Sequence, residues 1–136
     1  MIVDDHSGAR HLIRRVIARS DDTVIECGSA DEALGTIAAF QPNCVTMDVQ
    51  MPGQNAFAAI RVIREEHPGV RVVVVTGFDQ PDFRRAANDA GAAGYIAKDN
   101  LAGLYLLIAP QRLTSRQPAR AQLADMIETN PEMTKP

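Results

Sequence analysis

Three carboxylates, a hydroxyl and a lysine stand at the ends of apolar runs in this sequence. Asp4 and Asp5 follow the first run, Asp48 ends a run that precedes a Pro-Gly turn, and Thr76 and Lys98 end two later runs. Grouped carboxylates repel one another and need a cation or a proton, and Mg²⁺ takes oxygen ligands. A carboxylate can act as a nucleophile, while a metal and a lysine offset charge on transferred phosphoryl oxygens. These residue types therefore suit phosphoryl transfer to an aspartate.

Each of these residues also has a simpler interpretation. Asp4 and Asp5 could cap the helix that follows them, and Asp48 could be an ordinary loop aspartate. Thr76 could merely finish a strand, and Lys98 could be a solvated surface lysine. The shared site is favoured because all of these positions fall at the carboxyl ends of predicted strands.

Apolar periodicity predicts alternating strands and helices over residues 1 to about 108. The expected strands are 1–3, 23–27, 43–48, 70–76 and 95–97, and the expected helices are 7–19, 29–40, 55–66, 80–90 and 101–108. The valine run at 72–75 is continuous, which is typical of a parallel strand covered on both faces. The alternation predicts an α/β domain with right-handed crossovers. The carboxyl ends of its strands would meet along one edge.

Local signals mark several expected helix ends. Ser7 is a candidate cap for the first helix, and Ser29 opens a capping box before the second. Asp79 and Pro81 are candidates for the cap and the first position of the fourth helix. Pro110 is expected to cut the fifth helix short.

The composition indicates an ordinary globular domain. The chain has 136 residues, of which 46% are hydrophobic, and this suffices for one domain with a real core. A net charge of −3 argues against broad nucleic-acid binding. No apolar run approaches the ~20 residues that span a bilayer, and no signal peptide is evident. Cys27 and Cys44 lie in predicted strands, and free buried thiols in a reducing cytoplasm are the simplest interpretation, with a disulfide left open. CxxC spacing is absent, so no structural zinc site is indicated.

Residues 109–136 differ from the rest of the chain. They contain four prolines and carry no further strand signal. Residues 118–129 could form one short helix, and the remainder is expected to be a flexible tail. The sequence therefore divides into a domain over residues 1–108 and a C-terminal extension over residues 109–136.

Four stretches carry a resemblance to a known family. They are IVDDH at the start, MDVQMPG around Asp48, VVVVTGF around Thr76, and GAAGYIAKD ending just after Lys98. Their order and intervals resemble the receiver domain of two-component response regulators, over residues 1 to about 108. The resemblance implies a CheY-like, flavodoxin-like fold, with a doubly wound five-stranded parallel sheet of order 2-1-3-4-5 flanked by five helices.

The resemblance implies a metal-dependent phosphoacceptor site. Asp48 matches the phosphoacceptor. Asp5 matches the carboxylate that binds Mg²⁺ (or Mn²⁺) directly, and Asp4 matches its neighbour, which acts largely through water. Gln50 stands where a backbone carbonyl completes the metal shell.

The resemblance also implies a conformational switch. Lys98 matches the lysine that contacts the phosphoryl group, and Thr76 matches the hydroxyl that moves towards it. Tyr95 matches the aromatic side chain that then moves inward, although an aromatic residue here could equally be ordinary core. The surface formed by the fourth helix, fifth strand and fifth helix would repack, and partners would bind one state better.

The implied function is a phosphorylation-controlled signalling switch and not a turnover enzyme on external substrates. Its phosphoryl donor would be a sensor histidine kinase or a histidine phosphotransfer protein, and its output a downstream protein partner; a homodimer is left open, and no membrane partner is expected. The alternative is a phosphorylation-independent receiver-like module for interaction or dimerisation. A haloacid dehalogenase-type phosphatase would need D-x-D, whereas this chain has Asp4-Asp5-His6.

Three features depart from the family pattern. Only two residues precede Val3, so the first strand is short for a central strand, which suggests low stability or a truncated start. Ala56 replaces the usual glycine after the proline turn, so strain is expected there. Asp99 replaces a common proline, as in the branch with a LuxR-type helix-turn-helix output domain. Residues 109–136 are too few for that domain, so no direct DNA binding is expected.

Overall fold

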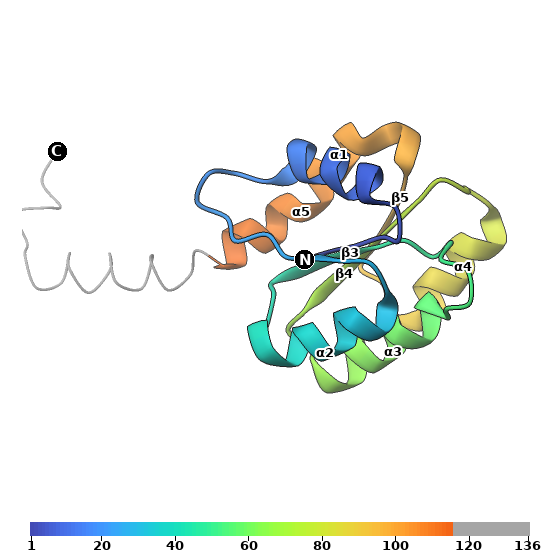
Figure 1. Ribbon diagram of the computed structural model, residues 1–136. Helices are drawn as coiled ribbons and strands as arrows, with labels where there is room; N and C mark the ends of the chain where they lie inside the picture. The colour runs from blue at the N-terminus through green and yellow to red at the C-terminus, as the bar shows by residue number, and fades with distance from the viewer. Residues whose placement is uncertain (116–136) are drawn as a thin grey trace, which may run out of the picture.

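The computed structural model describes residues 1–115, with side chains described as far as residue 108, and strands alternate with helices throughout (Figure 1). The elements in chain order are β1 (Ile2–Val3), α1 (Ser7–Ile17), β2 (Glu26–Cys27), α2 (Ala30–Phe40), β3 (Cys44–Met47), α3 (Ala56–Glu66), β4 (Arg71–Thr76), α4 (Pro81–Ala90), β5 (Gly94–Ala97), a 3₁₀ turn (Lys98–Asn100) and α5 (Leu101–Ser115). The predicted helix at 118–129 and the tail lie outside the described residues.

All five strands form one parallel sheet in the order β2-β1-β3-β4-β5, which confirms the predicted fold. β1 is central: Ile2 is paired with Glu26 of β2 on one side and with Thr46 of β3 on the other. The chain therefore crosses to one side of β1 and then to the other. The point where the strand order reverses, between β1 and β3, is where such sheets bind ligands.

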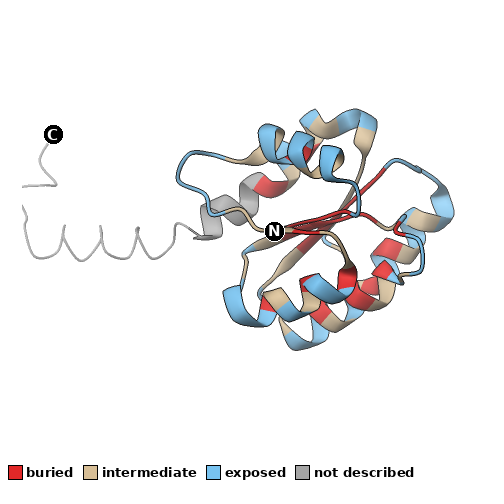
Figure 2. Cartoon of the chain, viewed as in Figure 1, coloured by how far each residue is buried: buried red, intermediate tan, exposed pale blue. Residues whose placement is uncertain are grey.

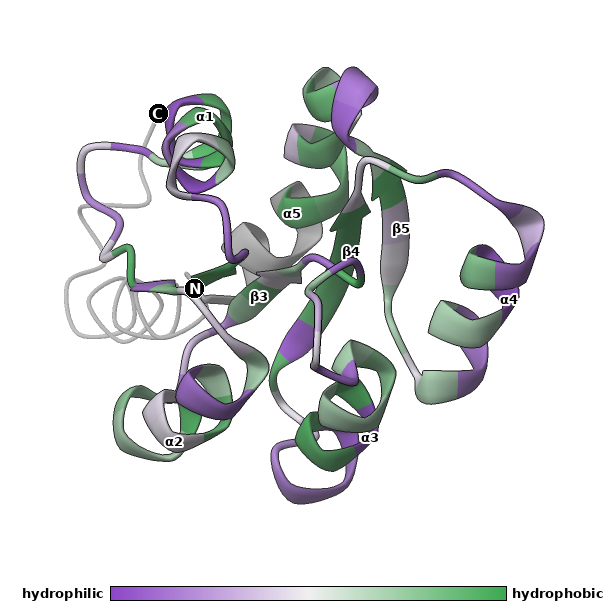
Figure 3. Ribbon diagram, turned by 45° about the vertical axis from the view of Figure 1, so that its right-hand side comes forward, coloured by the Kyte–Doolittle hydropathy of each residue, from purple (hydrophilic) through white to green (hydrophobic). Residues whose placement is uncertain are grey.

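Helices cover both faces of the sheet. α1 and α5 lie on one face, and α2, α3 and α4 lie on the other (Figure 1). Alternate valines of β4 serve the two cores, because Val73 and Val75 pack with the α1–α5 cluster and Val72 and Val74 with the other. Figure 2 shows the strands as largely buried, and Figure 3 shows the same strands as mainly hydrophobic. Two-sided burial explains the continuous apolar run, and each buried valine contributes about 1.5–3 kcal/mol.

The first two strands are shorter than predicted. Residues 23–25 lie outside β2, because β1 does not extend far enough to pair with them. In this region the two segments are joined by a backbone hydrogen bond from the Ile2 N–H to the Ile25 carbonyl, at 2.8 Å. A cavity of about 540 Å³ lies at this amino end of the sheet, with Met1 and Cys44 among its lining residues. The Met1 ammonium donates to the Cys44 carbonyl at 2.9 Å, and its burial lowers its pKa.

The caps of α1 and α2 were only partly anticipated. His6, and not Ser7, is the N-cap of α1, and its Nδ1 accepts a hydrogen bond from the Ala9 N–H at 3.2 Å. The capping role of Ser29 is confirmed, because its Oγ accepts from the Glu32 N–H at 3.1 Å. A cap accepts one of the helix's otherwise unpaired N–H groups, and an imidazole nitrogen does this as an oxygen does.

The later helices differ from expectation in two places. Gln80, and not Asp79, is the N-cap of α4, although Pro81 does take the first helical position. α5 continues through Pro110 to Ser115, so the expectation that Pro110 ends this helix is wrong. A proline inside a helix removes one N–H donor and crowds the preceding turn, which weakens the helix without necessarily ending it. None of the described helices combines the length with the hydrophobicity that a transmembrane span requires.

The loop between β3 and α3 is relaxed at Ala56, contrary to the expected strain. Ala56 is the first residue of α3 and is buried, and Asn55 caps the helix by accepting from the Ala58 N–H at 3.1 Å. The residue with a positive φ in this loop is Gly53, at 74°. Glycine therefore already stands where the backbone is left-handed, and an alanine three residues later has no conformational cost.

Candidate functional site

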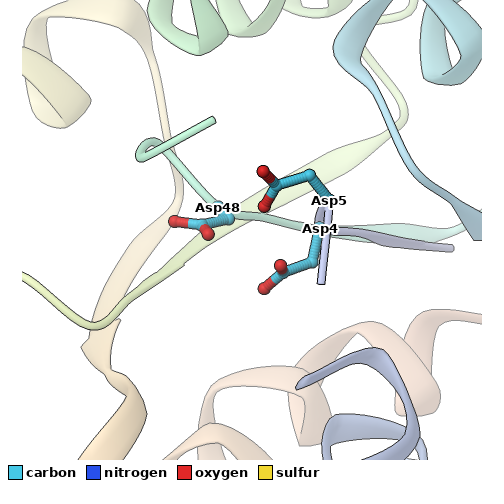
Figure 4. A group of neighbouring side chains, drawn as sticks. All are labelled: Asp4, Asp5 and Asp48. Carbon is cyan, nitrogen blue, oxygen red and sulfur yellow. The ribbon is translucent and has the colours of Figure 1, made fainter. Parts of the chain in front are cut away.

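Three carboxylates converge at the carboxyl edge of the sheet. Asp4 and Asp5 follow β1 and Asp48 follows β3, and the Asp48 N–H extends the ladder by donating to the Val3 carbonyl at 3.0 Å. Each residue offers one carboxylate oxygen, and these oxygens all lie within 4.8 Å of one another. Figure 4 shows the three groups projecting from adjoining strand ends. Asp4 and Asp48 are buried and Asp5 is exposed, so the cluster opens to solvent on one side.

Lys98 supplies the positive charge next to this cluster. Its Nζ lies 3.1 Å from Oδ2 of Asp48 and 2.7 Å from Oδ2 of Asp4. Burial by itself lowers the pKa of the ammonium, but the contact with Asp4 and the charge of Asp48 outweigh it, so the pKa is raised. Lys98 therefore stays protonated and holds two buried carboxylates on neighbouring strands together.

One carboxylate oxygen still lacks a hydrogen-bond donor among the described residues. Oδ1 of Asp4 accepts from the His6 N–H at 2.9 Å, but Oδ2 of Asp4 is buried and accepts no hydrogen bond. The Lys98 ammonium, 2.7 Å away, offsets the charge of this oxygen as an ion pair. A buried, incompletely satisfied carboxylate beside two others has excess negative charge.

The donor set fits a hard divalent cation. Carboxylate oxygens at this spacing are the ligands that Mg²⁺ prefers, and the exposed side of the cluster leaves room for its waters. Gln50 follows Asp48 by two residues, and its N–H donates to Oδ1 of Asp48 at 2.9 Å. This bond fixes the backbone of the loop that carries the predicted carbonyl ligand.

The two predicted switch residues are linked through Phe78. Thr76 is buried at the end of β4, opposite Ala97, and its Oγ1 accepts from the Phe78 N–H at 3.2 Å. The Tyr95 hydroxyl donates to the Phe78 carbonyl at 3.1 Å. Burial of the phenol, followed by the charge of Asp79, raises the pKa of Tyr95, so the hydroxyl keeps the proton that it donates.

Two residues that stabilise this edge of the sheet were not predicted from the sequence. Arg10 of α1 donates from Nη1 to the Asp4 carbonyl at 2.7 Å and pairs through Nε with Glu26 at 3.2 Å. Gln54 accepts from the Ala30 N–H at 2.6 Å, which ties the β3–α3 loop to the start of α2. Arg10 joins α1 to the residue after β1 and to β2, and Gln54 contacts a residue 24 positions earlier in the chain. Only the polarity of Arg10 and Gln54 near the motifs could have drawn attention to them.

A five-stranded parallel sheet with an acidic cluster at its switch point and a lysine after β5 defines a class of signalling domain. The family profile for the response regulator receiver domain matches residues 1–107, so the chain belongs to this family. Its members include proteins that interact with histidine kinases and with downstream partners.

Known relatives agree with this assignment. The chain is 36% identical over 131 residues to the response regulator GacA of Pseudomonas viridiflava, covering 91% of this chain and 61% of the relative. The chain thus spans about three fifths of the length of such curated relatives. A LuxR-family two-component response regulator from Aurantimonas sp. SI85-9A1 has a TM-score of 0.70 at 34% identity, covering 76% of each chain. A CheY-like receiver domain protein from Methanospirillum hungatei JF-1 (TM-score 0.73, 23% identity, 87% of this chain and 94% of that one) supports the fold alone.

Proposed function

We propose that this receiver domain is a phosphorylation-controlled switch in which Asp48 accepts a phosphoryl group. The main support for this proposal is the grouping of three carboxylates within 4.8 Å, with the Lys98 ammonium 3.1 Å from Asp48. This arrangement combines a nucleophilic oxygen, oxygen ligands for a divalent cation and a fixed positive charge. The donor would be a phosphohistidine on a sensor histidine kinase or a histidine phosphotransfer protein.

In the proposed reaction, a carboxylate oxygen of Asp48 attacks phosphorus while the bond from phosphorus to the donor's imidazole nitrogen breaks. The electron pair of that bond leaves with the imidazole. Asp5, Asp48, the Gln50 carbonyl and, through water, Asp4 would hold Mg²⁺ (or Mn²⁺), which when bound neutralises charge on the phosphoryl oxygens. Lys98 contacts the phosphoryl group from the other side, so it must loosen its ion pairs with the carboxylates.

The proposed output is a change in the surface of α4, β5 and α5. A phosphoryl group on Asp48 adds negative charge and acceptor oxygens. Thr76 then turns its hydroxyl towards the new group, and Tyr95 moves into the space that is left. A downstream protein binds one of the two surfaces better and so reads the state. The chain turns over only its own phosphoryl group, and its cytoplasmic location stays a prediction.

Intact mass spectrometry tests this proposal. The protein is incubated with Mg²⁺ and acetyl phosphate, beside an Asp48→Asn variant and a sample containing EDTA. One added phosphoryl group that is absent from both controls is the expected result. Folded protein that gains no mass would instead favour the phosphorylation-independent interaction module, and gain in the Asp48→Asn variant would move the acceptor elsewhere.

A further inference from the structure

Arg84 lies on α4, away from the acidic cluster, yet it contacts two residues next to the switch pair. Its guanidinium meets the Asp79 carboxylate in a fork, with Nε 2.9 Å from Oδ1 and Nη2 3.2 Å from Oδ2. The same guanidinium lies over the Tyr95 ring, with its central carbon 4.6 Å from the ring centroid. One side chain therefore joins the β4–α4 loop, α4 and β5.

Together with two backbone hydrogen bonds, these contacts form a closed chain of interactions that passes through Phe78. The peptide groups of Phe78 hold both switch residues, because its N–H donates to Thr76 and its carbonyl accepts from Tyr95. Asp79 is the next residue, and Arg84 connects it back to Tyr95. The Phe78 ring also packs edge-on against Phe83, with centroids 5.5 Å apart, so the loop is held on α4 at two points.

We propose that Arg84 is a positioning residue that, with Asp79, holds Tyr95 in a latch against the Phe78 carbonyl and thereby opposes the phosphorylated conformation. This inference rests on the proposed function, because it assigns a regulator to the same switch. For Tyr95 to move inward, its hydroxyl must leave the Phe78 carbonyl and its ring must leave Arg84. For Thr76 to turn towards Asp48, its hydroxyl must release the Phe78 N–H.

The strength of the latch depends on the stacking as well as on the ion pair. The side chains of Arg84 and Asp79 are 53% and 45% exposed, and an isolated pair so exposed has little effect. Stacking on the ring adds a cation–π contact, and the fork orients the guanidinium for it. The latch biases a two-state equilibrium, so removing it raises the population that is competent to bind a phosphoryl mimic. The apparent affinity for the mimic rises by the same factor.

The experiment measures beryllofluoride binding by calorimetry in the presence of Mg²⁺, for the parent protein and three variants. Arg84→Gln removes both contacts, and Asp79→Asn combined with Arg84→Gln tests whether the two residues act together. Arg85→Gln is the matched control, because Arg85 is the exposed neighbour on α4 and makes no hydrogen bond or ion pair within residues 1–108. Binding of Mg²⁺ alone is measured in parallel.

We expect Arg84→Gln to bind beryllofluoride about three- to tenfold more tightly than the parent. The double variant should match Arg84→Gln, and Arg85→Gln should match the parent. Binding of Mg²⁺ alone should be the same in all four proteins, which a general loosening of the fold would not produce. Equal beryllofluoride affinity of Arg84→Gln and Arg85→Gln, or weaker binding by Arg84→Gln, would overturn the latch.

A second measurement separates failure of the latch from failure of the proposed function. If the parent does not bind beryllofluoride at all, the proposed function fails, and the latch is then tested in the free protein by NMR. The chain has two tyrosines, so Tyr105 serves as an internal reference for the ring resonances of Tyr95. Loss of contacts between the Tyr95 ring and residues of the Phe78 loop in Arg84→Gln supports the latch, and retention of the parent pattern refutes it.

Discussion

At the scale of single residues, the site is held in an electrostatically unfavourable arrangement. Asp4 and Asp48 are buried beside each other and share one ammonium, while Asp5 adds a third carboxylate within 4.8 Å. Like charges this close disfavour the folded state unless a cation offsets them. The arrangement makes sense for a site that gains its full stability only with a bound cation.

The first prediction is that Asp5→Asn stabilises the metal-free protein. Removing one of three neighbouring carboxylates relieves repulsion, so the free energy of unfolding should rise by roughly 1 kcal/mol. Urea unfolding without divalent ions measures this. Added Mg²⁺ should then stabilise the variant less than the parent. Asp89→Asn, at an exposed position on α4, is the control and should change neither value; lower stability of metal-free Asp5→Asn would contradict the prediction.

At the scale of elements, β1 and α5 both depart from regular expectation. β1 is the central strand but contains only two residues, and it leaves a cavity of about 540 Å³ beside Met1. α5 contains a proline in its interior. Each is a local weakness. A two-residue central strand leaves the neighbouring segments beyond it without a pairing partner, and a helix that lacks one N–H donor loses a backbone hydrogen bond.

A second prediction is that lengthening β1 stabilises the domain. Adding the residues Val-Lys-Val ahead of Met1 should extend the strand into the cavity and raise the free energy of unfolding by about 1–2 kcal/mol, net of the entropy of ordering them. Denaturant unfolding measures the gain. A Gly-Ser-Gly extension is the control. It also replaces the buried ammonium by an amide but adds no apolar side chain, so its gain in unfolding free energy should be smaller.

The pH dependence of this gain has a defined sign. Burial lowers the pKa of the Met1 ammonium below its ordinary value of 8.0. Between the folded pKa and about pH 8, the unfolded chain binds more protons, so the stability of the parent rises with pH. An extended chain lacks this buried ammonium, so its advantage should narrow as the pH approaches 8. A difference in unfolding free energy between the extended and parent chains that widens towards pH 8 would contradict the lowered pKa of the Met1 ammonium.

A third prediction concerns Pro110. Replacing it with alanine restores an N–H donor inside α5, so helix content and melting temperature should both rise. The expected gain is about 1–3 kcal/mol, the range for proline in a helix interior. Circular dichroism and thermal unfolding measure it. Ala109→Gly is the control with the opposite expected effect, since glycine at the adjacent position should weaken the same helix. If Pro110→Ala gives no gain in stability, the helix ends before residue 110.

At the scale of the whole molecule, the position of the acidic cluster would couple binding of a cation to folding. The acidic cluster lies across β1 and β3, whose pairing joins the two halves of the sheet. The cluster exists only when that pairing exists, so a cation bound there stabilises the entire fold. Occupancy of the proposed cation site should therefore affect global stability as well as the proposed switch.

The fourth prediction follows from this coupling. Mg²⁺ at ten times its dissociation constant should raise the free energy of unfolding by about 1.4 kcal/mol, and tenfold more Mg²⁺ should add about the same again. Thermal unfolding over a series of Mg²⁺ concentrations, at constant ionic strength set with KCl, tests this. The Asp48→Asn variant should respond less. A melting temperature that is independent of Mg²⁺ would show that the cluster binds no cation.

Much of the fold followed from the sequence because its signals are local. The continuous valine run at 72–75 requires burial on two faces, and the alternation of strands with amphipathic helices leaves few arrangements besides a doubly wound sheet. Helix caps were less predictable. His6 is the N-cap of α1 where Ser7 was expected, and Asp79 pairs with Arg84 and does not cap α4. Caps are hard to predict because several neighbouring polar residues can take the capping position.

The sequence alone predicted which residues meet at the candidate site, because Asp4, Asp5, Asp48, Thr76 and Lys98 all lie at or just after the ends of predicted strands. Parallel strands end along one edge of the sheet. The contacts that hold these residues in place could be seen only in the folded protein. Lys98 bridges Asp4 and Asp48, and Arg84 reaches Asp79 and Tyr95. Strand ends can be predicted from the local pattern of apolar residues along the chain. Contacts between long side chains depend on distances set by packing of separate elements, and no local pattern encodes them.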